Sequence, residues 1–338
     1  MNTIRKTRVI IIMLSSFIYP CSISAEMVTG LYQARVLIAD RSESELTRGF
    51  SEALVKVLIK LTGQSQISSN MPWVSMLIDG AESLIERYSF EPKPENQTEL
   101  SLLAVFDKKI LSQELQTLEI RQWNSVRPKI LFRTRERYGT LLAEDILEQD
   151  YYDIINKKAT DRGLPVRFFQ SQSDSFENQY EDGSKLNYLA QYPAYVEFSI
   201  TSFTADKIQL NGSLFFLNKK KILNMSGNDI KALLDRMVDV TADHIASVIV
   251  LNDGGIEPQE VILEFFGIES REEFESLLKY LDALEQVGKT SVKTIEASSI
   301  ELEISVNGGV RGFEQSVIYS KVLQKTSDRN SLQYTFLE

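Results

Sequence analysis

The chain contains a single cysteine, and its position limits how the protein can be held together. Cys21 lies inside an amino-terminal segment that begins with basic residues, continues with an apolar run from Val9 to Ile18, and ends with small residues up to Ala25. This order is typical of a secretory signal. Once it is removed, residues 26–338 contain no cysteine. The exported chain must therefore fold on hydrophobic cores, without disulfide bonds, thiolate metal sites or a thiol nucleophile.

The apolar run of the segment is too short to cross a membrane, because a spanning helix needs about 20 such residues. We therefore expect a cleavable signal peptide over residues 1–25, a periplasmic mature protein, and no transmembrane segment in the mature chain. A lipoprotein anchored through Cys21 is the alternative interpretation. Tyr19 and Pro20 argue against it, because they stand where a lipobox has small residues.

Charge and histidine content exclude several classes of function. The chain has 37 basic and 47 acidic residues, a net charge of −10, and cleavage removes three basic residues and no acidic ones, which leaves −13. An acidic surface repels phosphate backbones, so we expect no nucleic-acid partner. His244 is the only histidine, which excludes a multi-histidine metal site. We expect no metal and no cofactor, and we interpret His244 as a partly buried structural residue rather than a general base.

Hydrophobic periodicity predicts an α+β protein of three small mixed domains over residues 26–126, 127–252 and 258–338. In the first, a strand over residues 31–38 precedes a helix that begins with a capping box of Ser42 and Glu45 and ends at Gly63. In the second, a βαβ-like unit precedes a hairpin over residues 195–217 and a long amphipathic helix over residues 226–250.

The third domain has the clearest pattern. Strands are expected over residues 261–266, 291–297, 300–306 and 332–337, and helices over residues 270–287 and 311–323. Ser270 and Glu273 form a second capping box at the start of the first of these helices. The resulting order, βαββαβ, is that of a ferredoxin-like sandwich.

Three stretches resemble domain-of-unknown-function family 2066, a family of exported proteobacterial proteins. They are the segment from Val28 to Val36, the helix from Glu52 to Gly63, and the junction of Trp123 with Arg127 and Pro128. The resemblance implies an exported envelope protein and supplies no catalytic residues. The chain departs from the family pattern at residues 133–137, where a more apolar run is expected.

Five basic residues at alternate positions form the candidate binding site: Arg127, Lys129, Arg133, Arg135 and Arg137. On an extended segment they would share one face, because strand side chains alternate. Such a stripe could bind an anionic partner. The alternative is a solvated edge strand whose charges prevent edge-to-edge pairing.

Three aspartates recur every four residues on the long helix of the second domain: Asp235, Asp239 and Asp243. Apolar residues define the opposite face, so we interpret the aspartates as its solvent side and not as a calcium site.

The chain shows no defensible set of catalytic residues. We therefore expect a non-enzymatic periplasmic protein that binds another envelope protein or an anionic envelope component. The alternative is a hydrolase that uses a pair of carboxylates on a cell-wall polymer. Such a pair needs a defined separation in space, which the sequence does not reveal.

The signal segment generates the first testable prediction. Protein recovered from the periplasm should begin at Ala25 or Glu26 when its amino terminus is sequenced, because small residues precede the cut. Recovery of an acylated Cys21 would contradict cleavage at this site and place the protein on a membrane.

Overall fold

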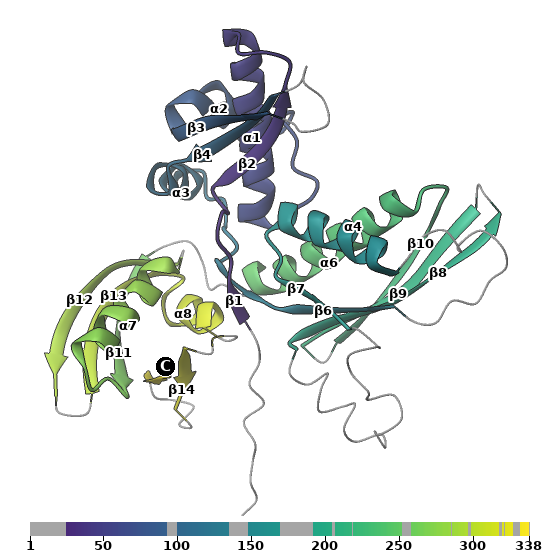
Figure 1. Ribbon diagram of the computed structural model, residues 1–338. Coiled ribbons are helices and arrows are strands. Elements are labelled where there is room, and N and C mark those ends of the chain that lie inside the picture. The colour runs from purple at the N-terminus through teal and green to yellow at the C-terminus, as the bar shows by residue number, and fades with distance from the viewer. Residues whose placement is uncertain are drawn as a thin grey trace, which may run out of the picture.

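A computed structural model describes the protein over residues 25–92, 100–134, 148–169, 192–204, 207–217, 219–251, 258–284, 286–296, 299–317, 320, 322–326 and 332–337. Within these residues no helix is long and apolar enough to span a membrane. Helices and small sheets alternate along the chain, which confirms the predicted α+β class. Figure 1 shows three lobes, and each lobe contains one hydrophobic cluster.

The first lobe packs helices against a three-stranded antiparallel sheet of order β2-β4-β3. Its strands are β2 (Gln33–Ile38), β3 (Ile85–Pro92) and β4 (Leu100–Phe106), and its helices are α1 (Glu43–Thr62), α2 (Pro72–Asp79), the 3-10 turn η1 (Ala81–Leu84) and α3 (Lys108–Thr117). The apolar face of α1 is buried against the sheet, as its periodicity predicts. Gly63 ends α1 in the left-handed conformation, with φ 73°.

The two predicted capping boxes have different outcomes. Ser270 accepts a hydrogen bond from the Glu273 N–H at 3.1 Å, and the Glu273 carboxylate accepts one from the Ser270 N–H at 2.8 Å, which confirms that box. The box at Ser42 was wrong, because the Ser42 side chain makes no capping bond. The Glu45 carboxylate instead accepts from the Ala39 N–H at 2.8 Å and is held by Arg48 at 2.8 Å.

The middle lobe has a mixed five-stranded sheet of order β10-β9-β8-β6-β7. Its strands are β6 (Ile130–Thr134), β7 (Val166–Phe168), β8 (Ala194–Thr204), β9 (Lys207–Phe216) and β10 (Lys219–Gly227). β6 runs parallel to β7 and to β8, and β8, β9 and β10 follow as an antiparallel meander. The βαβ unit and the hairpin are confirmed, whereas β10 was not predicted. The helices α4 (Glu148–Arg162) and α6 (Ile230–Leu251) cover one face of this sheet (Figure 1).

The third lobe confirms the βαββαβ order through β11 (Pro258–Phe266), α7 (Arg271–Ala283), β12 (Val287–Ile295), β13 (Ser299–Asn307), α8 (Gly309–Val317) and β15 (Gln333–Phe336). The strands lie in the order β12-β13-β11-β15, and the short strand β14 (Leu323–Lys325) adds an unpredicted outer strand beside β15. β15 lies next to β11, so the last strand of the predicted order is beside the first. The two strands are parallel, whereas the last strand of a ferredoxin-like sandwich runs antiparallel to the first, so the direction of β15 departs from that fold.

A short segment between the first two lobes contacts all three. β1 (Ala25–Met27) pairs with β5 (Val126–Pro128), and Trp123 is packed in the middle core. Val126 is packed in the core of the third lobe, where the Ser125 hydroxyl donates to the Ala283 carbonyl at 2.7 Å. Residues 123–128 therefore connect cores that are far apart in the sequence.

The third lobe generates a prediction about independent folding. A fragment of residues 258–338 should give dispersed amide NMR signals and a cooperative thermal melt, because its sheet and both helices are complete. It should melt below the full chain, since it lacks Val126. A collapsed spectrum without a cooperative transition would contradict independent folding.

Candidate functional site

Arg127, the first member of the predicted basic stripe, is completely buried. Its Nε donates to the Asn124 carbonyl at 2.9 Å, its Nη1 to the carbonyls of Arg162 and Gly163 at 3.0 and 2.9 Å, and its Nη2 to the carbonyls of Lys60 and Trp123 at 2.7 and 3.3 Å. A guanidinium has five N–H donors, so these carbonyls match its full capacity. The guanidinium also lies 4.1 Å from the centre of the Trp123 ring. Arg127 therefore faces the protein interior.

The other members of the stripe lie in different surroundings. Lys129 is paired with Glu26 at 2.7 Å, and Arg133 lies 3.9 Å from Glu197 and 4.9 Å from the centre of the Phe169 ring. Their side chains are only 17% and 19% exposed. Arg135 and Arg137 lie outside the described residues. The three described members do not form an exposed stripe, which corrects the shared-face prediction.

The edge-strand alternative was also wrong. β6 is an interior strand between β7 and β8, and Ile130, Leu131 and Phe132 are all fully buried. Arg133, the basic residue of β6, therefore cannot protect an exposed strand edge. Lys129 lies between β5 and β6 and belongs to neither strand. The alternation of side chains expected of one continuous strand therefore does not hold there.

A second buried arginine organises the aspartates of the long helix. Arg162, whose side chain is 2% exposed, binds Asp239 at 2.6 Å and Asp243 at 2.7 Å. It also donates to the Gly63 carbonyl at 2.7 Å. Asp243 accepts from the N–H and hydroxyl of Ser65 at 2.8 and 2.6 Å. The interpretation of these aspartates as a solvent face was wrong for Asp239 and Asp243, which join α6 to α4 and to the loop after α1.

Two glycines permit this close packing. Gly163 has φ 63°, and a Cβ added there would lie 2.7 Å from Arg127 Nη1. A Cβ at Gly63 would overlap Ala246 and lie 2.8 Å from the Trp123 ring. Both positions also end helices in a left-handed conformation that side chains rarely adopt. Nearby, burial lowers the pKa of Lys60 to about 8, opposed by the charge of Asp161 and assisted by that of Arg127. This buried cluster is structural.

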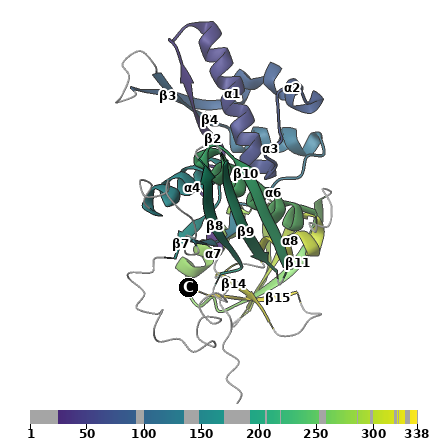
Figure 2. The same ribbon diagram turned by 90° about the vertical axis from the view of Figure 1, so that its right-hand side faces the viewer.

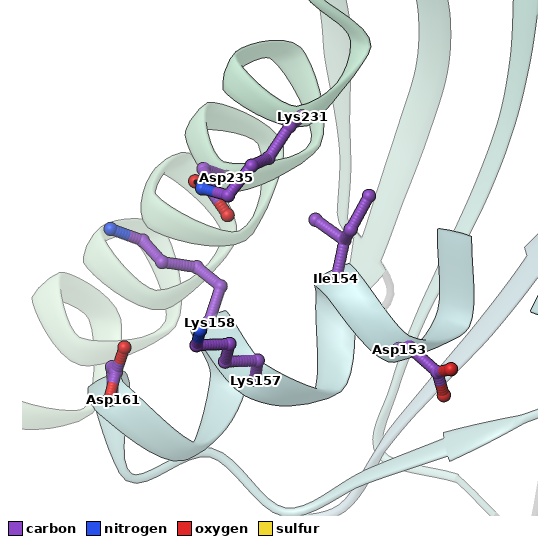
Figure 3. A pocket seen from close by; sticks show the side chains of 7 residues that line it. All are labelled: Asp153, Ile154, Lys157, Lys158, Asp161, Lys231 and Asp235. Carbon is purple, nitrogen blue, oxygen red and sulfur yellow. Dashed lines mark hydrogen bonds and ion pairs between the residues drawn. The ribbon is translucent and has the colours of Figure 1, made fainter. Parts of the chain in front are cut away.

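A shallow groove of about 380 Å³ lies between α4 and α6 (Figure 3). Seven residues line it: Asp153, Ile154, Lys157, Lys158, Asp161, Lys231 and Asp235. Lys231 is paired with Asp235 at 2.6 Å, and Lys158 with Asp239 at 2.9 Å. In Figure 3 Asp153 points away from the other charged side chains. Because its charges largely neutralise one another, the groove gives the predicted carboxylate hydrolase no specific support.

Three consecutive lysines at the start of β10 form a cluster of positive charge in the middle lobe. Lys219 and Lys220 are exposed and Lys221 is half-buried. Lys220 lies over the Phe215 ring at 5.4 Å, and Phe215 stacks on Tyr195 at 4.4 Å. Within the part of the chain that the structure describes, none of the three lysines forms an ion pair. We call Lys219, Lys220 and Lys221 the lysine edge.

His244, on α6, lies beside the lysine edge. Burial lowers its pKa, and the charges of Lys221 and Lys219 lower it further. The side chain is half-buried, in agreement with the structural role expected for it. Its position makes it a local probe of charge at the lysine edge, because the chain has one histidine. Sequence analysis missed this site because three consecutive lysines resemble a polar turn more than a strand.

The amino-terminal part of the chain matches a known family. Residues 25–124 match the family described as Domain of unknown function (DUF8605). This finding corrects the resemblance to family 2066, which is a different family. The matched residues cover the first lobe and reach Trp123, and they exclude Arg127 and the lysine edge. No curated protein matches the chain.

Three solved structures show limited similarity. The Protein Y N-terminal domain from Thermus thermophilus is 15% identical, with 36% of this chain and 94% of that chain covered and a TM-score of 0.19. TolB from Acinetobacter baumannii is 17% identical, with coverage of 40% and 32% and a TM-score of 0.22. Prolyl-tRNA synthetase from Cryptosporidium parvum is 10% identical, with coverage of 61% and 47% and a TM-score of 0.18. Similarity at this level supports no conclusion about activity.

The buried cluster generates a stability prediction. Arg162→Met should lower the free energy of unfolding by about 2–4 kcal/mol, because it leaves Asp239 and Asp243 without their buried partner. The measurement is urea unfolding monitored by far-UV circular dichroism.

Lys158→Met is the matched control, since it removes a more exposed cation from the same Asp239. It should cost about 1 kcal/mol or less. Equal losses in the two variants would show that burial of Arg162 does not set the strength of this contact.

Proposed function

We propose that the protein is exported to the periplasm and acts there, without enzymatic activity, as a binding protein for an acidic envelope protein. The observation that carries the proposal is the lysine edge. Its three cations have no acidic partner among the described residues, on a chain whose net charge is −10. Uncompensated charge of one sign steers partners of the opposite sign and rejects those of the same sign.

Solubility does not explain the lysine edge. The acidic surplus of the chain already supplies a net charge large enough to keep it dispersed. Lys219, Lys220 and Lys221 follow one another in the chain, so their like charges repel one another at short range. A negative group from a partner would relieve this repulsion, so the site favours an anionic ligand over a neutral one.

The proposal predicts that charge removal at the lysine edge abolishes partner capture. A photo-crosslinking residue at Ile222, which is 56% exposed, should form a discrete protein adduct in intact envelopes. The triple variant Lys219→Ser, Lys220→Ser, Lys221→Ser should lose the adduct, and added salt should weaken capture by the unaltered protein. The melting temperature should change little, because exposed charges usually contribute within about 1 kcal/mol.

A matched control removes the same charge elsewhere. Lys108→Ser, Lys109→Ser, Lys289→Ser changes three exposed lysines far from β10 and should retain the adduct. Loss of the adduct in both triple variants would mean that only net charge matters and would refute the lysine edge as the site. Capture by anionic lipid vesicles without a protein adduct would also contradict the proposal.

A further inference from the structure

β10 offers a free strand edge in the middle sheet. It is the outermost strand, and all nine of its residues pair with β9 without a register shift. No strand within the described ranges pairs with its other side. In Figure 2 the strands β8, β9 and β10 lie toward the viewer. The outward N–H and C=O groups of such a strand are a template for one more strand.

The other outer strands are less suitable. β1, β5, β7 and β14 have three residues each, and β2 has six. β12 is as long as β10 but carries two register shifts, and β3 carries one. Such irregularities are a common way to prevent unwanted strand pairing. Of the described outer strands, β10 therefore combines the greatest length with a regular edge.

The charges of β10 indicate the chemistry of the strand that would pair with it. Its only charged residues are Lys219, Lys220 and Lys221, at one end, and residues 222–227 are uncharged. Lys219 and Lys221 lie on the side of His244, while Lys220 lies on the opposite face over Phe215. Opposite charges on paired strands are favourable and like charges are not. A complementary strand would have acidic residues at one end and small or apolar residues along the rest, where Ile222 is exposed.

We propose that β10 receives an extended acidic segment of a protein partner, which adds to the middle sheet as a sixth strand. Main-chain hydrogen bonds to the outer edge of β10 provide the attachment, and the lysine edge selects the acidic sequence. This inference rests on the proposed function, because it names how the same site holds its partner.

Synthetic peptides test strand addition separately from charge attraction. Two nine-residue peptides serve as probes, in which three glutamates either precede or follow six alternating threonine and valine residues. Each peptide is also made with N-methyl groups on alternate amides along one edge, and then along the other. An N-methyl group removes the donor and blocks pairing on that edge. Binding is measured by calorimetry with the full mature chain.

Strand addition predicts an asymmetric result. For at least one peptide, methylation of one edge should weaken binding at least tenfold, and methylation of the other edge should leave it unchanged. Hydrogen exchange of the outward-pointing amides of β10 should slow at least tenfold on binding. The single imidazole signal of His244 should shift in the same titration, since the charges of Lys221 and Lys219 act on this group.

The failures of the two proposals are distinguishable. If the Lys219→Ser, Lys220→Ser, Lys221→Ser variant loses binding but neither methylation matters and β10 exchange is unchanged, the lysine edge binds anions and strand addition is wrong. If neither unmodified peptide binds at low salt, strand addition is also wrong. A salt-resistant dimer of the chain that protects the outward amides of β10 would identify a second copy as the occupant and overturn the acidic partner.

Discussion

The guanidinium group of Arg127 is the interaction on which the arrangement of the chain depends. It binds carbonyl oxygens at the carboxyl ends of α1 and α4, which belong to different lobes. The last carbonyls of a helix have no partner within the helix and carry partial negative charge. One buried cation thus satisfies two helix ends at once. Lysine could not replace it, because an ammonium group has three donors and no planar fork.

Arg162 extends this junction in the other direction. It ends α4, binds the carbonyl of Gly63 after α1, and binds Asp239 and Asp243 on α6. The same region continues through Ser125 and Val126 into the third lobe. The junction therefore joins the lobes. At the other side of the middle sheet, β10 is the outer strand, and no described strand pairs with its free edge. The junction and the free strand edge thus lie in different parts of the middle lobe.

Local patterns allowed much of the fold to be predicted from the sequence. The periodicity of α1, its end at Gly63, the capping box at Ser270 and the order of the third lobe all depend on residues close in the sequence. The capping box at Ser42 failed because Ala39 and Arg48 compete for the Glu45 carboxylate. The spacing of Ser and Glu does not reveal such competition.

The candidate site was much less predictable. An arginine is usually exposed, so residue type alone predicts a surface position for Arg127. Its burial follows from the carbonyls of Lys60, Arg162 and Gly163, which lie far away in the sequence. The spacing of Asp239 and Asp243 matches a solvent face, and their partner Arg162 lies 77 and 81 residues away in the chain. Lys219 to Lys221 interrupt the alternation by which strands are recognised. Gly163 was the available signal, since a glycine after a helix often accompanies close packing.

The most direct test of the central claim is calorimetry of residues 26–252 with and without Arg127→Met. If Arg127 couples the first two lobes, the unaltered protein should unfold in one cooperative transition, and the variant should show two transitions or one broad transition whose calorimetric enthalpy exceeds the van't Hoff enthalpy. A single transition of unchanged cooperativity in the variant would contradict the claim that this buried guanidinium holds the two lobes together.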